Sequence, residues 1–452
     1  MNIIIAGIGK VGNTLAENLV AEGHNVTLID TNADTVRSAT EQNDAIGLIG
    51  NGASMEVLRE AEIAKANLLI ASTGSDEVNL LACLTAHGMN PKIHTMARIR
   101  NPEYAEQAYR MRDLFALSVI FNPERQTAME IERLLKYPGF LKRDSFAKGR
   151  VEIVELRIEK DSVLSGVTLR QLYDIVKCRV LVCAVARSGE THIPSGDFRL
   201  ESGDRIYVTA PTDALSLLLK NLGIITHKVR RVVLLGGGTI SYYLAQALEG
   251  SRIQVEIIEK DEKTCRYLSE QLPKTNITQG DVTNQALLES TSFSGCDALV
   301  SLTGLDELNM VLSLYGSSNG IPHIITKISR SEDSKITDGL PLGSVVCPRK
   351  LCCNNIVRYV RAMEKKAGAA ITIHSIAEGR AEALEFLVDE HTQNCAIPLK
   401  HIKFKPGVLL VCITRNGKIE IPGGDTSFQR GDNVVIVSNR DTSIMSLNDI
   451  FA

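Results

Sequence analysis

Three glycines near the start of the chain have the spacing of a phosphate-binding loop. Gly7, Gly9 and Gly12 follow a short apolar run, Ile3–Ala6, and precede a helical pattern that extends over Val11–Ala21. In such a loop the first glycine permits a tight turn, the second lets backbone approach a pyrophosphate, and the third brings the helix close to the strand. The start of the helix offers unpaired N–H groups and a partial positive charge. The spacing therefore predicts a site for a ligand that carries phosphate.

An acidic side chain stands where such a site needs one. A second apolar run, Val26–Ile29, ends in Asp30, and a carboxylate at this position can accept the two hydroxyls of an adenosine ribose. NADP, which carries a 2′-phosphate, is disfavoured for that reason. The alternative is a strand–helix–strand unit that uses its glycines only for packing. The order of strand, glycines, helix, strand and acid favours nucleotide binding.

The same pattern returns in the second half of the chain. An apolar run at 231–235 leads into Gly236–Gly238, and a later apolar run ends in Glu259. The first glycine and the acid are both shifted by 229 positions from their counterparts in the first half. Ser241 stands where the third glycine belongs, and its side chain adds bulk between helix and strand. We therefore expect a second nucleotide site that is weaker, altered or empty.

Other motifs repeat at nearly the same offset and divide the chain into four parts. Thr73–Asn79 returns as Thr303–Asn309, and the pattern in Arg187–Asp204 returns in Arg415–Asp432. Such repetition indicates duplication of a two-part unit. The predicted parts are N1 (1–140), C1 (150–222), N2 (228–365) and C2 (368–452).

Strands that alternate with helices place N1 and N2 in the α/β class. Further strands are predicted at 44–49, 67–71, 93–98 and 116–120 in N1, and at 151–158, 180–187, 192–193 and 204–209 in C1. A helix begins near Pro123, which suits a first-turn proline. This order predicts doubly wound, Rossmann-like parallel sheets with right-handed crossovers. C1 and C2 are predicted to be small α+β domains, and the polar stretch 141–150 is predicted to be a hinge.

More candidate residues stand where the predicted strands end. Asn51-Gly52 follows the third strand of N1, and Asp281-Val282 has the same place in N2. This edge of a doubly wound sheet lies beside the adenine of a bound nucleotide. Asp281 could accept the adenine amino group, whereas Asn51 could do so only through its amide oxygen. The alternative is that these loops only cap the next helices.

A small hydroxyl and a glycine follow the fourth strand of each sheet. Thr73-Gly74 in N1 and Thr303-Gly304 in N2 would let backbone lie against the nucleotide. Asp76 and Asp306, a few positions later, are expected to cap the next helix.

Cations occupy the end of the fifth strand in both halves. Arg98 in N1 and Lys327 in N2 are placed for phosphate, and only the arginine offers a bidentate fork. The alternative for Arg98 is a surface ion pair. Lys10, inside the glycine turn, either approaches phosphate or is solvated.

Composition excludes several classes of function. The 50 basic and 53 acidic residues give a net charge of −3, which argues against nucleic acid or an anionic membrane as a direct partner. No apolar run reaches the ~18 residues of a membrane span, and no export signal is seen. The ten cysteines are scattered, with Cys352-Cys353 the only adjacent pair, which favours reduced thiols over metal ligands or disulfides. No GxSxG, HExxH or P-loop motif appears, and we expect no enzyme.

Together these motifs resemble the regulators of potassium conductance, or RCK, family of potassium-transport nucleotide-binding proteins. The resemblance rests on Gly7–Gly12 with Asp30, on Gly50–Ser54, on Thr73–Asn79 and on Ala97–Tyr104. The order N1–C1–N2–C2 is similar to that of the peripheral subunits of bacterial potassium uptake, and it covers essentially the whole chain.

The resemblance implies a cytoplasmic protein on the inner face of the cell membrane. It implies a homo-oligomer, a tetramer or ring, beneath a potassium-translocating membrane subunit of the TrkH or TrkG type. It also implies that NAD(H) and ATP or ADP change the shape of the ring and so gate potassium flux. The alternatives are regulation of another potassium channel or efflux antiporter, and an NAD-dependent dehydrogenase, which would need a catalytic His or Lys.

Carried over by position, the family pattern assigns residues to two sites. The first would be lined by Gly7, Ile8, Gly9, Lys10, Val11, Gly12, Asp30, Asn51, Gly52, Thr73, Gly74 and Arg98. The second would be lined by Gly236, Gly238, Thr239, Ile240, Glu259, Asp281, Val282, Thr303, Gly304 and Lys327.

Overall fold

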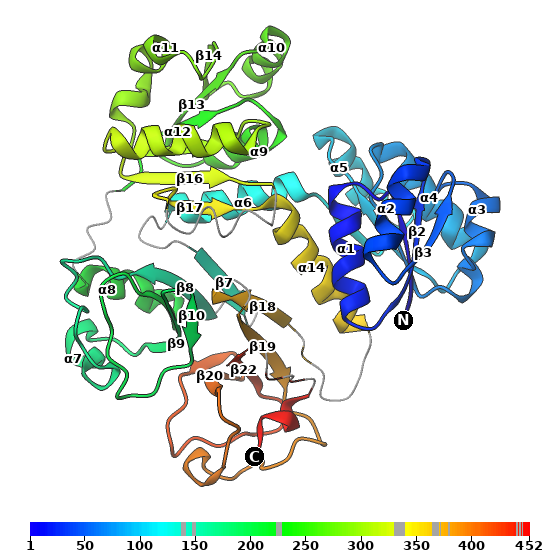
Figure 1. Cartoon of the computed structure of the whole chain (residues 1–452). Helices are drawn as coiled ribbons and strands as arrows, with labels where there is room; N and C mark the ends of the chain where they lie inside the picture. The colour runs from blue at the N-terminus through cyan, green and yellow to red at the C-terminus, as the bar shows by residue number, and fades with distance from the viewer. Residues whose placement is uncertain are drawn as a thin grey trace.

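Within the residues that it describes, the computed structural model has four sheets, two of them parallel and two antiparallel (Figure 1). It describes residues 1–136, 142–146, 151–222, 228–329, 340–363, 370, 372–377, 380–439, 442, 444 and 446–452. Each parallel sheet has six strands and is followed along the chain by an antiparallel sheet of five. The predicted α/β class, with two Rossmann-like domains each followed by a smaller domain, is confirmed.

The N1 sheet has the strand order β3-β2-β1-β4-β5-β6. Its strands are β1 (Asn2–Ala6), β2 (Asn25–Asp30), β3 (Ile46–Ile49), β4 (Leu68–Ala71), β5 (His94–Arg98) and β6 (Val119–Phe121). Its helices are α1 (Lys10–Ala21), α2 (Ala33–Gln42), α3 (Met55–Glu60), η1 (Ile63–Lys65), α4 (Asp76–Met89), α5 (Pro102–Arg110) and α6 (Pro123–Lys136). The sixth strand starts three residues later than predicted, because Ala116 has a positive φ that no strand accommodates.

The N2 sheet repeats this order as β14-β13-β12-β15-β16-β17. Its strands are β12 (Arg231–Leu235), β13 (Gln254–Glu259), β14 (Asn276–Gln279), β15 (Ala298–Ser301), β16 (His323–Lys327) and β17 (Ser344–Val346). Its helices are α9 (Thr239–Leu248), α10 (Glu262–Gln271), α11 (Gln285–Ser290), η4 (Ser292–Gly295), α12 (Asp306–Ser318) and α14 (Pro348–Met363).

Burial explains why these segments form strands and helices. The central strands β1 and β4 are covered on both faces, which is why they read as continuous apolar runs. On α1 the buried residues Val11, Leu15 and Leu19 recur every four positions, so they form one stripe against the sheet. Each such leucine contributes about 1.5–3 kcal/mol through burial. These contacts hold the glycine loop, which lies between β1 and α1.

The last helix of each half packs into the core of the other half. Helix α6 is the last helix of N1 in sequence, yet its buried Ile131 and Leu134 belong to the same core as Leu244 and Leu248 of α9. Helix α14 is the last helix of N2 in sequence, yet its buried residues, Ile356 among them, join the N1 core beside α1. Figure 1 shows α6 and α14 side by side between the two sheets. Each half therefore completes its core with a helix from the other.

Polar contacts reinforce this exchange. Arg361 of α14 donates through Nε and Nη2 to the carboxylate of Glu22, just after α1, at 2.9 and 2.5 Å. Tyr243 of α9 accepts from Asn122 at 3.1 Å and donates to the backbone oxygen of Arg100 at 3.0 Å. These bonds join N1 to N2.

The C1 and C2 domains are antiparallel sheets with short helices. C1 contains β7 (Lys142–Phe146), β8 (Val151–Arg157), η3 (Leu169–Gln171), α7 (Leu172–Val176), β9 (Leu181–Arg187), β10 (Glu190–His192), β11 (Arg205–Pro211) and α8 (Thr212–Asn221). C2 contains β18 (Thr372–Ile376), β19 (Ala381–Leu387), η6 (Leu399–His401), β20 (Val408–Arg415), β21 (Lys418–Glu420), β22 (Asn433–Asn439) and η7 (Leu447–Ile450). The predicted hairpin of β9 and β10 is confirmed.

The prediction of a hinge at 141–150 is wrong for its central part. Lys142–Phe146 forms β7, which pairs with β8 at the edge of the C1 sheet. A strand at an edge can be polar, because charged side chains there discourage pairing with other chains. Residues 141 and 147–150 lie outside the described residues.

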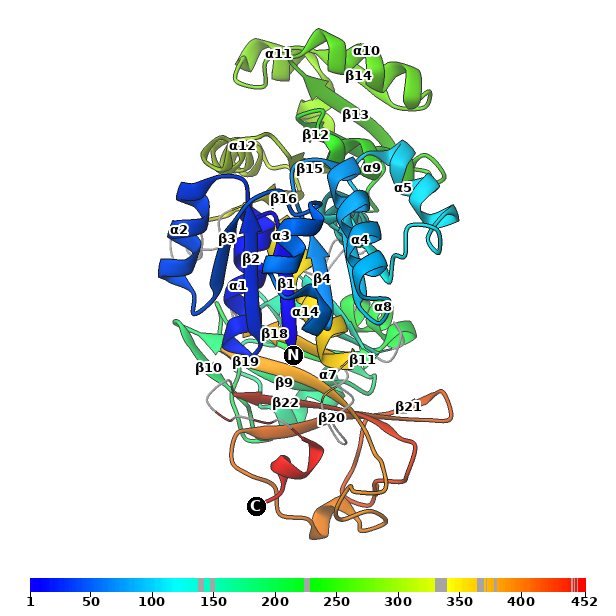
Figure 2. The ribbon, with the colours of Figure 1, turned by 90° about the vertical axis from the view of Figure 1, so that its right-hand side faces the viewer.

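One face of the C1 sheet packs against one face of the C2 sheet. Their shared core includes Cys183 and Tyr207 from C1 with Val411, Cys412 and Val437 from C2. In both views the two C domains lie toward the lower end of the molecule, below N2 (Figure 2). The halves of the chain are thus joined at two levels, through the exchanged helices and through the C domains.

A duplicated ion pair stabilises each C domain. Arg187 donates to Asp204 through two nitrogens at 2.7 Å, and Arg415 donates to Asp432 at 2.9 and 2.8 Å. Both aspartates are buried, and both also accept from backbone N–H groups. The pair explains why this arginine and this aspartate recur in the repeat.

We expect Asp432→Asn to lower the free energy of unfolding of the full chain by about 3 kcal/mol, because it leaves the Arg415 guanidinium without its bidentate partner. Urea unfolding would measure the change. Asp425→Asn is the matched control, because Asp425 pairs with Lys400 at the surface and such pairs contribute about 0–1 kcal/mol. Equal effects of the two substitutions would contradict the structural role of the buried pair.

Candidate functional site

The first glycine loop has no room for side chains where it touches the sheet and open space where it faces outward. Gly7 has φ +95°, and a Cβ there would lie 2.6 Å from the backbone nitrogen of Thr73. A Cβ at Gly12 would lie 2.0 Å from the carbonyl oxygen of Gly7. Gly9, the N-cap of α1, is different, because a Cβ there would meet no other atom within 4 Å. The predicted roles of Gly7 and Gly12 agree with these contacts.

The open positions recur around both predicted sites. A Cβ at Gly74, Gly238 or Gly304 would likewise meet no atom within 4 Å beyond its chain neighbours. Gly238 is the N-cap of α9, as Gly9 is of α1. Two helix N-termini therefore face open space, and the residues present fit the phosphates of a nucleotide.

Each predicted ribose-binding acid also holds its glycine loop. Asp30 accepts from the N–H groups of Ile8 and Asn32, at 2.8 and 3.0 Å. Glu259 accepts from those of Gly237 and Asp261, at 2.6 and 2.9 Å. A carboxylate oxygen can accept a further hydrogen bond, so these contacts leave capacity for ribose hydroxyls. Ribose binding itself stays a prediction.

At the second site Ser241 takes the place of the third glycine, and a serine hydroxyl still bonds the carbonyl oxygen of the first glycine. In N1 the hydroxyl of Ser72, after β4, donates to the carbonyl oxygen of Gly7 at 2.8 Å. In N2 the position of Ser72 is taken by Leu302, and the hydroxyl of Ser241 donates to the carbonyl oxygen of Gly236 at 2.5 Å. The serine thus moves from the strand end to the helix while the bonded carbonyl stays the same. Its bulk is accommodated within the loop.

We expect Ser241→Ala to destabilise N2 by about 1 kcal/mol through loss of this hydrogen bond. Ser72→Ala should have the same effect in N1. Urea unfolding monitored in the full chain would measure both. Ser54→Ala is the control, because Ser54 is a helix N-cap whose side chain makes no capping bond. A loss for Ser241→Ala no larger than that for Ser54→Ala would show that the bond is not stabilising.

In the loops predicted to lie beside adenine, the polar side chains hydrogen-bond to neighbouring residues of the same loop. Asn51 accepts from the N–H of Ala53 at 3.0 Å. Asp281 accepts from the N–H and the hydroxyl of Thr283, and these two hydrogen bonds lower the pKa of Asp281. Gly52 packs tightly, since a Cβ there would lie 2.5 Å from the Cβ of Ala6. Contact with adenine stays a prediction.

Four of the predicted site residues have buried apolar side chains. Ile8 and Val11 belong to the N1 core and Ile240 to the core around α9. They could contact a ligand only through backbone. Val282 is likewise packed in an N2 core.

A buried asparagine, absent from the predicted site residues, organises each sheet edge. Asn79 accepts from the N–H and the hydroxyl of Thr73, both at 2.8 Å, and donates to the carbonyl oxygen of Arg98 at 2.9 Å. Asn309 repeats these bonds with Thr303 and Lys327, at 2.8, 2.7 and 3.0 Å. The threonine–asparagine spacing, present in both repeats, was the available sequence signal.

The expected capping role of Asp76 and Asp306 is wrong. Ser75 caps α4, while buried Asp76 accepts from the N–H groups of Arg100 and Asn101, at 2.9 and 2.8 Å. Asp306 accepts from the N–H of Ser329 at 2.9 Å. Both aspartates therefore hold the loop after the fifth strand, because that loop approaches the start of the helix only in the folded sheet.

The two cations at the sheet edges differ in their partners. Arg98 donates to Glu124 at 2.8 Å, and both side chains are about four-fifths buried. Lys327 donates to the carbonyl oxygen of Leu302 at 3.4 Å, and burial lowers the pKa of Lys327. Lys10 is exposed at the start of α1. The ion-pair alternative for Arg98 is thus present, in a largely buried form.

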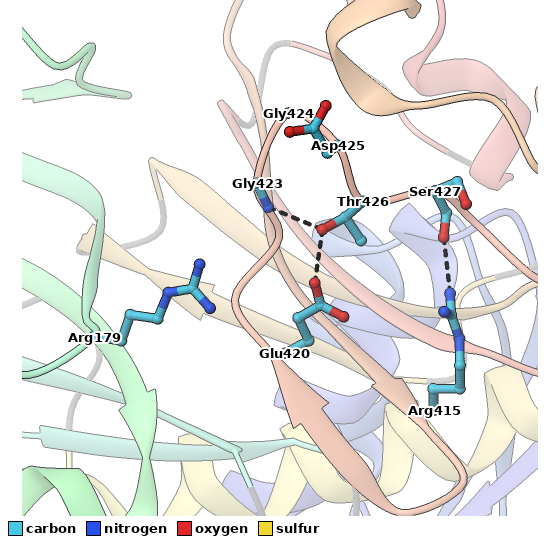
Figure 3. Close-up of a pocket in the computed structure, with 8 residues that line it drawn as sticks. All are labelled: Arg179, Arg415, Glu420, Gly423, Gly424, Asp425, Thr426 and Ser427. Atoms are coloured by element: carbon cyan, nitrogen blue, oxygen red, sulfur yellow. Dashed lines mark hydrogen bonds between the residues drawn. The ribbon is translucent and has the colours of Figure 1, made fainter.

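A polar cavity of about 470 Å³ lies between the C domains (Figure 3). It is lined by Arg179, Arg415, Glu420, Gly423, Gly424, Asp425, Thr426 and Ser427. Arg179 comes from C1, and the others come from C2. Thr426 donates to Glu420 at 2.7 Å and accepts from Gly423 at 3.1 Å. Several of its polar groups are thus bonded to one another, and we assign no ligand to it.

Neither a metal-binding cluster nor a membrane-spanning helix is found among the described residues. No group of three or more His, Cys, Asp or Glu residues among them could hold a metal ion. Among the same residues no helix is both long enough and apolar enough to cross a membrane.

Comparisons with known proteins agree with this architecture. The model of the TrkA-N domain matches residues 3–122 and 232–348, and that of the TrkA-C domain matches 153–223 and 384–452. The Trk system potassium uptake protein TrkA homolog of Archaeoglobus fulgidus is 30% identical over 451 residues, with 100% of both chains covered. The Trk system potassium uptake protein TrkA of Halomonas elongata is 31% identical over 447 residues, covering 96% of this chain and 95% of the relative.

A solved structure shares the fold at low sequence identity. The GsuK channel bound to NAD is 17% identical, with a TM-score of 0.61, and the match covers 97% of this chain and 77% of the channel chain. At this identity the likeness shows the fold alone.

Proposed function

This chain belongs to the TrkA family of potassium uptake proteins, and we propose that it is a nucleotide-sensing subunit that gates potassium entry. The relatives are named as potassium uptake proteins, which supports a role in potassium transport rather than in catalysis. The resemblance to the RCK family is thereby confirmed. The proposal adds the ligands, the partner and the way in which binding acts on transport.

The ligands we propose are NAD(H) and ATP or ADP. Support comes from the two glycine loops, whose helix N-termini face open space beside Asp30 and Glu259. A channel of the same fold is described as bound to NAD. All residues predicted to line the two sites remain part of this proposal, through backbone where their side chains are buried.

The helix exchange is the single observation that carries the sensing proposal. Because α6 and α14 complete each other's cores, the two glycine loops stand on one continuous packed unit. A ligand favours one conformation of such a unit only by binding it more tightly than another. Nucleotide at either loop can therefore shift how N1 sits against N2. The C domains, which pack against each other, join the same two halves of the chain.

The partner we propose is a membrane subunit of the TrkH or TrkG type. A homo-oligomer, as a tetramer or ring, would sit at the cytoplasmic face of the cell membrane and transmit the shift to the pore. We also propose the predicted boundaries 1–140, 150–222, 228–365 and 368–452 for the four units along the chain.

Two measurements test the proposal. Calorimetric titration of the full chain with NADH, NAD, ATP and ADP should give binding by at least one of them. Potassium flux into liposomes that hold the membrane subunit should then depend on both this chain and the bound nucleotide. Absence of binding by all four would overturn the sensing role, and flux that ignores bound nucleotide would overturn gating.

A further inference from the structure

The loop after β5, residues 99–101, is bonded on one side to the edge of the first site. The guanidinium of Arg100 donates to the carbonyl oxygen of Gly74, and its Nε lies 3.7 Å from the carboxylate of Asp76. The N–H groups of Arg100 and Asn101 donate to the same aspartate at 2.9 and 2.8 Å. Gly74 is one of the residues predicted to line the first site, and it faces open space. These contacts fix the loop to the strand end that carries Gly74.

The same loop is bonded on its other side to the helix of the second site. The hydroxyl of Tyr243 donates to the carbonyl oxygen of Arg100 at 3.0 Å and accepts from Asn122 at 3.1 Å. Tyr243 lies on α9, five residues after the N-cap Gly238 of the second glycine loop. Arg100 thus bonds Gly74 through its side chain and α9 through its backbone. One residue of N1 therefore connects the edges of both predicted sites.

The bond of the tyrosine hydroxyl is buried, and its direction is fixed. Tyr243 and Asn122 are each 7% exposed. The side-chain oxygen of Asn122 accepts from the N–H of Arg125 at 2.8 Å, so its amino group is the one that meets the tyrosine. Burial raises the pKa of Tyr243 to about 12, and the phenol therefore keeps the proton that it donates. Displacing such a group would leave buried polar atoms unpaired, which is costly.

The equivalent residues of the other half are bonded differently. Thr14 has the place on α1 that Tyr243 has on α9, at the repeat shift of 229, and its hydroxyl donates to Lys10 of the same helix at 3.1 Å. Ser329 corresponds to Arg100, and its carbonyl oxygen accepts from Arg349 of its own half at 2.6 Å. Within the described residues, this polar link therefore runs only from the loop of N1 to the helix of N2. The repeated fold does not require it, since the first copy forms with a threonine.

We propose that Tyr243 is a positioning residue that couples the two sites, so that nucleotide at one site changes the affinity of the other through Arg100. A ligand against Gly74 favours one position of its carbonyl group, and with it one position of the Arg100 loop. That loop is bonded to α9, at whose N-terminus the phosphates of the second ligand would lie. Two ligands that bias the same element are coupled, and the coupling is reciprocal. This inference rests on the proposed nucleotide sensing and adds the contact by which the sites communicate.

The test is a pair of calorimetric titrations of the full chain, ATP with and without saturating NADH, and NADH with and without saturating ATP. In the wild type we expect each affinity to change by the same factor, about fivefold or more. Coupling reaches a plateau as the second ligand is raised, whereas competition for one site does not. Tyr243→Phe should reduce the factor to about twofold or less. The affinity for each nucleotide alone should stay within about twofold of wild type.

The single-loop variants Gly9→Ala and Gly238→Ala cover the case in which one nucleotide fills both sites. They give its two separate affinities, and coupling is then the departure of the unsubstituted chain from two independent sites with those affinities. Two sites that fill independently, or a second site that stays empty with both nucleotides, would overturn the coupling. Wild-type protein that binds neither nucleotide would overturn the sensing proposal itself, which is a different result.

The neighbouring tyrosine provides the matched control. Tyr242 contacts the rings of Tyr243 and Tyr267, and Tyr242→Phe should keep the wild-type factor. Arg100→Met removes the bond to Gly74 at the other end of the link and should lower the factor as Tyr243→Phe does. It also provides the readout if the Tyr243 variant is unfolded. Coupling that survives both substitutions would overturn the role of this link and assign the coupling to the packing of the exchanged helices.

Discussion

Gly9→Ala is expected to weaken nucleotide binding strongly at the first site, and Gly238→Ala at the second, while the protein stays folded. A methyl group at either position would project into the open space in front of the helix N-terminus and meet no protein atom. It would keep the phosphates from the backbone N–H groups. Loss of two charge-assisted hydrogen bonds weakens binding by about a hundredfold or more. Calorimetric titration with NADH and ATP would measure the loss.

The fold should tolerate both substitutions. Gly9 has φ −71° and Gly238 has φ −69°, values that alanine adopts without strain. The cost of alanine in place of glycine at an N-cap is about 0.5 kcal/mol. Gly88→Ala is the matched control, because Gly88 lies inside α4 and also faces open space, so that alanine there should stabilise by about 0.5–1 kcal/mol. Unchanged affinity in both loop variants would show that the phosphates do not bind these helix ends.

Ile131→Ala is expected to loosen N2 although Ile131 belongs by sequence to the first half. Its side chain is fully buried in the core that includes α9 and β12. Removal of such a side chain costs about 2–5 kcal/mol. Hydrogen exchange of the full chain should show faster exchange for amides of α9 and β12, with those of β1 much less affected.

Ile356→Ala provides the reciprocal experiment. Ile356 lies on α14 in the N1 core, so its truncation should speed exchange in α1 and β1 rather than in β12. Val311→Ala, at an exposed position of α12, should change stability by no more than about 0.5 kcal/mol. If Ile131→Ala loosened β1 and spared β12, each helix would pack on its own sheet and the coupling proposed for the two sites would lose its basis.

The sequence by itself determined the elements that depend on local patterns. Buried strands such as β1 and β4 read as apolar runs because both faces are covered. Gly12 is required by its contact with Gly7 in the same strand–helix turn, whereas Gly7 is required by its positive φ and by the close approach of Thr73 after β4. The duplication was visible because both copies must satisfy the same contacts. For these reasons the α/β class, the two glycine loops and the family could be predicted.

Only the tertiary structure decided which partners those elements meet. The apolar stripe of α6 shows that one face is buried but not against which sheet, since any apolar surface satisfies it. The sequence of β7 is polar, which is common for a strand at the edge of a sheet, so no apolar run marks it as a strand. Sequence analysis therefore missed both the helix exchange and the full extent of the C1 sheet.

Long-range polar contacts were equally beyond the sequence. The bonds of Asp76 to the loop after β5 and of Arg98 to Glu124 join residues that are about 25 positions apart, and many polar side chains lie at such separations. The serine that bonds the glycine-loop carbonyl comes from the strand end in one half and from the helix in the other. Folding brings both positions to the same carbonyl, and only their positions in space show that they are equivalent.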